Sequence, residues 1–278
     1  MTVVAAVYLL QEIVMIADTR IWWDVNRPPE DKLIKLYRLQ GFGKPAVVGF
    51  AGRVDSAADV LKSVKAKCEA YRGRPALSSL KEHLRKWIEE VTVGLDRDQR
   101  RLKFVLCGLE PKGHLAVVHN GKKVRSLPLP ETHVYEFTVV KRTGEVTVER
   151  IQRVVEVIGS GRCHSRQIAS KVSSLMKWGI RHSQRRPARA VVLGEALASV
   201  FYDARDDKVG GPFQVLRIAP EDVYSYWVWP PGTKSRDVVV REEPDRLVLS
   251  NRDSEQDYVL YPIWQLRGTE ARMAEARA

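Results

Sequence analysis

The second residue of the chain carries the groups that a nucleophilic catalyst needs. Thr2 follows the initiator methionine, and aminopeptidases remove that methionine when the next residue is small. The mature chain would then begin with a threonine whose hydroxyl is a nucleophile and whose α-amine, with a pKa of about 8, can accept the hydroxyl proton. We therefore consider Thr2 the first candidate for a catalytic residue.

The cysteines and histidines indicate no competing centre. The chain has three cysteines, which are widely spaced and form no Cys-x-x-Cys pair. This spacing argues against a zinc site or a disulfide frame and favours a reducing, cytoplasmic location. Cys163 and His164 are adjacent, but neighbours on a helix point apart, so a Cys–His catalytic pair is not expected. No metal ion and no cofactor are expected.

The first residues must form the element that positions Thr2. Residues 3–10 and 13–17 are short runs rich in apolar and β-branched side chains, joined by a polar dipeptide. This pattern predicts a buried β-hairpin. A secretory signal is not expected, because no basic residue precedes the first run and residues 18–20, Asp-Thr-Arg, stand in place of a small-residue cleavage site.

Helical and strand-like patterns alternate along the next two hundred residues. Apolar residues at helical spacing predict helices over 55–71, 76–91, 164–181 and 187–202. Runs typical of strands cover 33–39, 46–52, 102–110, 114–120, 133–141, 144–157 and 209–218. Residues 121–132 have turn composition and are expected to form an inserted loop. The order predicts an α+β fold in which two helical layers enclose two packed sheets.

The last part of the chain differs from the rest. Residues 221–278 contain short strand-like runs joined by charged turns and end in a stretch rich in Ala, Arg and Glu. We expect a main domain over 1–220 and a C-terminal β extension over 221–278. Short strands with large aromatic side chains are not stable alone, so we expect these aromatic residues to pack on a neighbouring subunit. They are Trp227, Trp229, Tyr258, Tyr261 and Trp264.

The bulk composition is that of a soluble globular protein, with 44% hydrophobic and 29% charged residues. No run approaches the roughly 18 apolar residues of a membrane span. The formal net charge of +12 is spread along the chain, with small basic clusters at 121–125 and 182–189. Because no RNA-binding signature accompanies this charge, we interpret it as a solvated surface and expect no nucleic-acid partner.

Five short segments occur in the order in which the proteasome β-subunit family has them. They are T-V-V-A-A-V at 2–7, A-D-T-R at 17–20, D-K-L-I-K-L-Y at 31–37, V-G-F-A-G at 48–52 and I-G-S-G at 158–161. With them, the sequence over residues 2–218 resembles this family, including the bacterial peptidase that partners an unfolding ATPase. The resemblance implies a four-layer αββα sandwich of the N-terminal-nucleophile hydrolase type.

The resemblance also implies a role for several residues. Thr2 would supply the attacking hydroxyl and, through its amine, the general base. Asp18 would orient the cluster and balance Lys32, and Lys32 would lower the proton affinity of the hydroxyl. Lys35 is the alternative to Lys32. The backbone N–H of Gly49 would donate a hydrogen bond to the oxyanion.

Three further residues receive supporting roles from the same resemblance. Ser160 would form a hydrogen bond near the Thr2 amine. Val47 and Ala51 would flank the pocket for the substrate residue that precedes the scissile bond.

One segment departs from the family's pattern. The family usually has an Asp and then, after a spacer of two residues, a Ser just before a glycine pair. Here residues 206–211 read D-D-K-V-G-G. Lys208 or Val209 takes the place of the Ser, and the Asp is either Asp206 or is replaced by Arg205. Because one hydrogen bond to the Thr2 amine is then missing, slow activity is expected.

The resemblance favours a threonine peptidase that hydrolyses peptides or unfolded proteins inside a homo-oligomeric ring or stack of rings. It also suggests an ATPase unfoldase as a partner. Two alternatives stay open. The first is a peptide ligase, an activity of proteasome homologues in some methanogens. The second is a non-catalytic scaffold subunit, against which the presence of the Thr, Asp and Lys argues.

Overall fold

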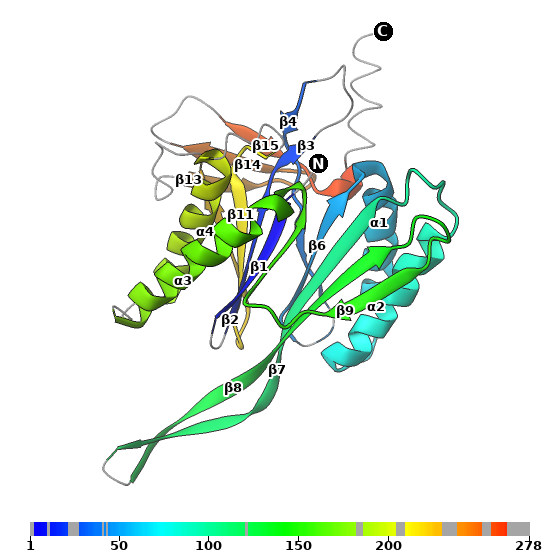
Figure 1. Ribbon diagram of the computed structural model, residues 1–278. Coiled ribbons are helices and arrows are strands. Elements are labelled where there is room, and N and C mark those ends of the chain that lie inside the picture. The colour runs from blue at the N-terminus through cyan, green and yellow to red at the C-terminus, as the bar shows by residue number, and fades with distance from the viewer. Residues whose placement is uncertain are drawn as a thin grey trace.

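Two antiparallel five-stranded sheets form the body of the chain (Figure 1). The computed structural model describes residues 3–9, 12–21, 28–40, 42, 44–119, 122–181, 186–203, 209–229, 238–251 and 257–265. The first sheet has the order β10-β1-β2-β11-β12, with β1 Val3–Leu9, β2 Glu12–Asp18, β10 Val155–Gly159, β11 Phe213–Ile218 and β12 Val223–Val228. The second has the order β5-β6-β7-β8-β9, with β5 Leu36–Arg38, β6 Ala46–Gly52, β7 Leu102–His119, β8 Lys122–Val139 and β9 Val146–Arg150.

Two pairs of helices cover the outer faces of these sheets (Figure 1). Helices α1 (Val54–Ala70) and α2 (Leu77–Thr92) pack on the second sheet, and α3 (Ser165–Arg181) and α4 (Arg186–Asp203) pack on the first. A short 3-10 helix, η1 (Ser160–His164), joins β10 to α3. All four helices begin and end within one residue of the ranges that the apolar periodicity predicts.

The predicted N-terminal hairpin is confirmed, and its side chains explain why it reads as apolar throughout. β1 and β2 pair antiparallel, with Val4 opposite Ala17. Successive side chains of a strand point to opposite faces. Val3 and Ala5 accordingly belong to the cluster with α3 and α4, while Val4 belongs to the cluster between the two sheets. Both faces of the hairpin are therefore buried.

Most of the loop expected over residues 121–132 is instead a strand. Residues 122–132 belong to β8, which pairs with β7 from Lys103–Thr138 out to His119–Lys122 and forms a hairpin that projects from the body (Figure 1). Register shifts lie between residues 111 and 113 and between 117 and 118. Beyond the sheet each strand of this hairpin has one free edge, which accommodates prolines such as Pro128. The turn-like composition of this segment therefore wrongly predicted a loop.

The run at 144–157 also differs from the single strand expected. It divides into β9, which belongs to the second sheet, and β10, which belongs to the first. The chain crosses between the sheets near Ile151, whose N–H donates to the carbonyl of Val134 at 2.9 Å. No glycine or proline marks this crossing, so the sequence carried no signal for it.

The C-terminal segment packs on the chain's own core, which corrects our expectation of a neighbouring subunit. β12 lies beyond the boundary expected at residue 220 and pairs with β11 in the first sheet. The next strands form a small three-stranded sheet: β13 Val238–Glu242, β14 Leu247–Asn251 and β15 Tyr258–Leu260. Trp227 and Trp229 are buried in a cluster with Leu249 and Leu260.

A second contact ties the end of the described chain to the body. The N–H of Tyr261 donates to the carbonyl of Lys32 at 2.8 Å, and the Trp264 ring lies 4.9 Å from the ring of Tyr37. Ile263, in the 3-10 turn η3 (Ile263–Gln265), is fully buried in the cluster under α1 and α2. Within the described residues, none of the helices is long and apolar enough to cross a lipid bilayer.

This packing predicts that the C-terminal segment contributes to the stability of the body. Ile263→Ala should lower the free energy of unfolding by about 2–5 kcal/mol, because it leaves a cavity at a fully buried position. The matched control is Val239→Ala on β13, where the valine is exposed and the change should stay within about 0.5 kcal/mol. Urea unfolding of both variants measures this. Equal, small effects would show that the segment does not belong to the core.

Candidate functional site

The carboxylate of Asp18 is bonded directly to the start of the first strand. Asp18 ends β2, and its Oδ1 accepts a hydrogen bond from the backbone N–H of Val3 at 3.0 Å. The antiparallel pairing of β1 with β2 brings these two residues together. The first described residue of the chain is thus fixed against a buried carboxylate.

Lys35 contacts the same carboxylate oxygen. Its Nζ lies 2.7 Å from Oδ1 of Asp18 and donates to the carbonyl of Arg20 at 2.6 Å. Both side chains of this ion pair have no solvent exposure. Removing two charges from water is costly, so a pair of this kind is stable only when geometry and additional hydrogen bonds compensate. The Val3 and Arg20 backbone groups provide those bonds.

Burial acts in opposite directions on the two groups. It lowers the pKa of Lys35 below its usual range, although the Asp18 charge opposes this. It raises the pKa of Asp18, against the opposing effects of Lys35 and of the backbone N–H groups of Val3 and Gly210. A buried lysine with a lowered pKa and a fixed partner is a common feature of catalytic sites.

Lys32 does not make the contact with Asp18 that we expected. It forms an ion pair with Glu30 and is partly exposed. The N–H groups of Lys32 and Leu33 both donate to the carbonyl of Thr19. In the segment that follows this contact, the side chains of Leu33 and Lys35 are fully buried. Alternation thus directs Lys35 inward and Lys32 outward. The apolar Leu33 two residues before Lys35 was the signal that could have shown this.

The N–H of Gly49 is directed into the sheet. Gly49 lies in the middle of β6, opposite Leu36 on one side and Val105 on the other. The side-chain amide of Gln214 binds both the N–H and the carbonyl of Leu36, at 3.0 and 3.1 Å, so the Leu36–Gly49 pair exchanges no backbone hydrogen bonds. The ladder alternates, and the N–H of Gly49 therefore points toward Val105.

Close packing around Gly49 leaves no room for a side chain at this position. A Cβ there would lie 2.9 Å from Cδ2 of Leu36 and 3.0 Å from Cγ1 of Val4. The two sheets approach closely at this point.

Gly52 is a glycine that the sequence analysis did not select. It ends β6 just before α1, with a φ of 127°, and a Cβ there would lie 1.9 Å from the carbonyl oxygen of Arg101. Counting along the ladder from Gly49, the N–H of Gly52 points away from β7. Its position between a predicted strand and a predicted helix was the available signal.

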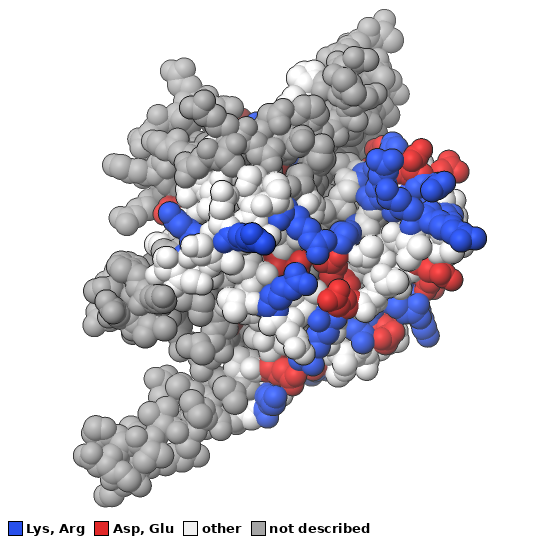
Figure 2. All heavy atoms as spheres, in the orientation of Figure 1, with Lys and Arg blue, Asp and Glu red and all other residues white. Residues whose placement is uncertain are grey.

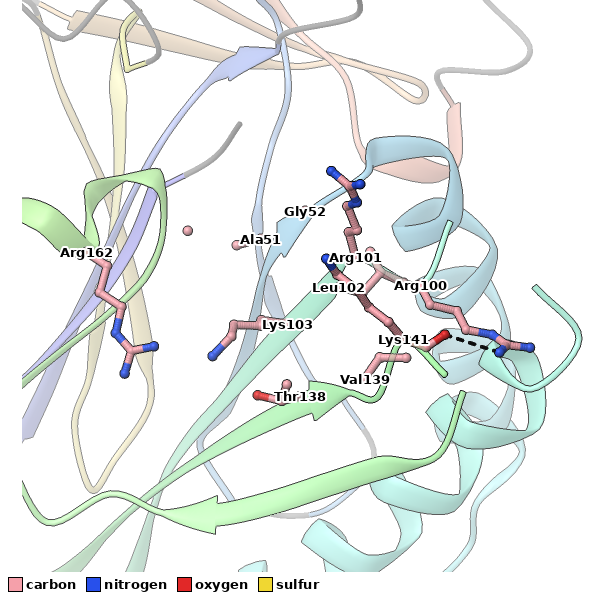
Figure 3. Close-up of a pocket in the computed structure, with 11 residues that line it drawn as sticks. Ala51, Gly52, Arg100, Arg101, Leu102, Lys103, Thr138, Val139, Lys141 and Arg162 are labelled. Carbon is pink, nitrogen blue, oxygen red and sulfur yellow. Dashed lines mark hydrogen bonds between the residues drawn. The ribbon is translucent and has the colours of Figure 1, made fainter. Parts of the chain in front are cut away.

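A cavity of about 380 Å³ opens beside Gly52 (Figure 3). Ala51 and Gly159 also line it, and Gly159 pairs with Val3 at the start of β1. The cavity therefore lies at the end of the sheets where the chain begins. Its other lining residues are Arg100, Arg101, Leu102, Lys103, Thr138, Val139, Lys141 and Arg162.

The remaining expected site residues divide into three groups. Ala51 lines the cavity, whereas Val47 is fully buried between the sheets. Ser160 begins η1, directly after Gly159. Thr2 and Asp206 lie outside the described residues. In the part of the chain that the structure describes, no group of three or more His, Cys, Asp or Glu side chains could hold a metal ion.

The glycine pair that follows the departing segment packs against the site. A Cβ on Gly210 would lie 2.2 Å from Cζ of Arg20, and one on Gly211 would lie 2.3 Å from Oγ1 of Thr19. Val209, one of the two residues that could stand in place of the Ser, is buried in the apolar cluster with α3 and α4.

Comparison with known proteins finds similarity in structure and none in sequence. No protein-family model and no curated protein matches the sequence. Among solved structures, the Gly-1 mutant of Anbu from Hyphomicrobium sp. strain MC1 superposes with a TM-score of 0.59 and 14% identity, covering 100% of this chain and 98% of that one. The chain has a proteasome-related fold. At this identity the likeness shows the fold alone. Its coverage includes residues 221–278, which lie outside the sequence resemblance.

The two lysines provide a matched test of the site's electrostatics. Lys35→Met should lower the free energy of unfolding by about 3–5 kcal/mol, because it leaves the buried Asp18 without its partner. Lys32→Met should cost at most about 1 kcal/mol, because its ion pair is partly exposed. Urea unfolding of both variants measures the difference, and equal losses would contradict the assignment.

The loss in Lys35→Met should also depend on pH. Without the lysine the pKa of Asp18 rises further above its unfolded value, so the folded state binds a proton that the unfolded state releases. A raised pKa favours folding at low pH, and this contribution is lost as the pH rises. The deficit relative to wild type should therefore grow from about pH 5 to about pH 8. A deficit that shrinks over this range would contradict the sign.

Proposed function

We propose that the chain is a threonine peptidase of the N-terminal-nucleophile type. Removal of Met1 would leave Thr2 as the first residue, with Val3 immediately after it. The observation that carries the proposal is the buried carboxylate of Asp18, which holds both the Val3 N–H and Lys35 Nζ on one oxygen. A residue preceding Val3 would then have a lysine ammonium close to its own hydroxyl and amine.

In this proposal the sheets and helices form the four-layer αββα sandwich of such hydrolases. Three apolar clusters support it: one between the sheets, one under α1 and α2, and one under α3 and α4.

The proposed reaction begins with attack of the Thr2 hydroxyl oxygen on the peptide carbonyl. The Thr2 amine accepts the hydroxyl proton, directly or through water, and delivers it to the leaving amine. This releases the first product and leaves an ester on Thr2, which water hydrolyses. The positive charge of Lys35 lowers the proton affinity of the hydroxyl, and Asp18 holds Lys35 in place.

We assign two roles to residues other than those first expected. Lys35 replaces Lys32 as the activating lysine. Gly52 replaces Gly49 as the donor to the oxyanion, because its N–H is directed away from the ladder and a glycine there permits close approach of the substrate backbone. Ser160 and Asp206 keep the supporting roles that the family resemblance implies.

Val209 supports the expectation of slow turnover. A buried valine offers no hydroxyl to the Thr2 amine. If an amine rather than water resolves the ester, the same residues perform peptide ligation, and the assay below includes that outcome. A non-catalytic scaffold would give neither hydrolysis nor ligation in that assay.

We also propose that the chain acts as a homo-oligomer, in a ring or stacked rings, on peptides or on proteins fed by an ATPase. The projecting hairpin of β7 and β8 supports an assembly, because a two-stranded ribbon is marginally stable unless something covers it. Light scattering on the purified protein tests the oligomer, and a monomer would contradict it.

The activity test compares wild type with Thr2→Ala, Lys35→Met and Lys32→Met on a panel of fluorogenic peptides. Thr2→Ala should abolish hydrolysis, and Lys35→Met should reduce kcat/KM by about a hundredfold or more, as loss of a charge that stabilises the transition state does. Lys32→Met should stay within about threefold of wild type, because its ion pair is with Glu30 and not with Asp18. Activity that survives Thr2→Ala would refute the proposal. A parallel assay with a free-amine acceptor peptide, analysed by mass spectrometry, detects ligation.

A further inference from the structure

The cavity beside Gly52 has a lining of one charge sign. Five of its lining side chains are cationic: Arg100, Arg101, Lys103, Lys141 and Arg162. No carboxylate is among the described residues that line it. These cations come from three separate parts of the chain, namely η1, the segment into β7 and the end of β8. Figure 3 shows Lys103 and Arg162 extending into the space from opposite sides, and Figure 2 shows basic side chains, with acidic ones among them, across this face.

Some of this charge already has partners. Lys103 pairs with Glu136, and Arg101 lies 3.4 Å from Asp98 with both groups largely exposed. Arg100 serves the fold, because its guanidinium donates to the carbonyls of Thr92 and Val93 at the end of α2.

Arg162 and Lys141 differ from these three. Both are exposed to solvent at the cavity. Arg162 acts electrostatically on the carboxylate of Glu156, which is almost fully buried and whose pKa is raised mainly by that burial. Arg153 also lies 3.8 Å from that carboxylate. The positive charge of the cavity is therefore only partly balanced.

We propose that this cavity binds a carboxylate of the peptide substrate and so favours acidic peptides. The proposal rests on the function proposed above, because the cavity is adjacent to Gly52 and to Gly159, which pairs with Val3. Two groups share the required chemistry: the side chain of Asp or Glu, and the C-terminal carboxylate of a short peptide. Several cations around one cavity attract either group and repel a basic one.

The test measures binding without turnover, in the Thr2→Ala background, by fluorescence anisotropy of labelled peptides. The four peptides carry either Glu or Gln at one position and have either a free or an amidated C-terminus. We expect tighter binding for the carboxylate-bearing peptides, by about fivefold for one exposed charge contact. Raising salt from about 0.05 M to about 0.5 M should remove most of the difference, because it shortens the screening length. The comparison of Glu with Gln tests the side-chain carboxylate, and the comparison of the free with the amidated C-terminus tests the C-terminal carboxylate.

Two variants locate the effect. Arg162→Gln and Lys141→Gln should each reduce the preference for the carboxylate peptides by about threefold and leave binding of the Gln amide peptide unchanged. Lys62→Gln, on the exposed side of α1, is the matched control and should change neither. Thermal unfolding of each variant checks that the fold is intact.

The outcomes separate this inference from the proposed function. Equal affinity for all four peptides, or a preference unaffected by both cavity variants, would overturn the inference even if the enzyme hydrolyses peptides. A charge preference that maps to Arg162 and Lys141 would support the cavity assignment even if Thr2 proved inactive, in which case the proposed function alone would fail.

Discussion

The arrangement of the site depends on one buried ion pair. Asp18 and Lys35 come from opposite sides of the seam between the two sheets, and neither is exposed to water. A charge in that position is strongly unfavourable without its partner, so the pair fixes the end of β2 against the chain that leads into β5. Because the same carboxylate oxygen accepts the Val3 N–H, the pair also fixes where the first strand begins.

The two sheets are in close contact near this ion pair. Gln214, on β11 of the first sheet, binds the backbone of Leu36 in the second through both atoms of its side-chain amide. A glycine at position 49 lets Leu36 and Val4 approach the strand, as no larger residue could. The short β5, the direction of the Gly49 N–H and the inward position of Lys35 are consequences of the same local register.

Local sequence patterns predicted the elements well and the side-chain register poorly. The β1–β2 hairpin and α1 to α4 have strong periodicity, because each buries one or two continuous faces. Residues 32–35 are mostly irregular, so the family motif alone did not decide between Lys32 and Lys35. The apolar Leu33 was the one local signal for Lys35, and the hydrogen bonds to Thr19 fix this register. The role of Gly52 likewise depends on ladder alternation across β5, β6 and β7, which no local pattern contains. The β8 extension was missed because cross-strand pairing overrides turn composition.

The central claim is that Asp18 and Lys35 activate an N-terminal Thr2, and covalent labelling tests it most directly. A peptide epoxyketone reacts with a hydroxyl and an adjacent free amine together, so it forms its ring adduct only with an N-terminal nucleophile of this kind. We predict that tandem mass spectrometry will place a single adduct on Thr2 of protein lacking Met1, and that Lys35→Met will label far more slowly than Lys32→Met. Retention of Met1, or an adduct on any other residue such as Cys163, would contradict the account.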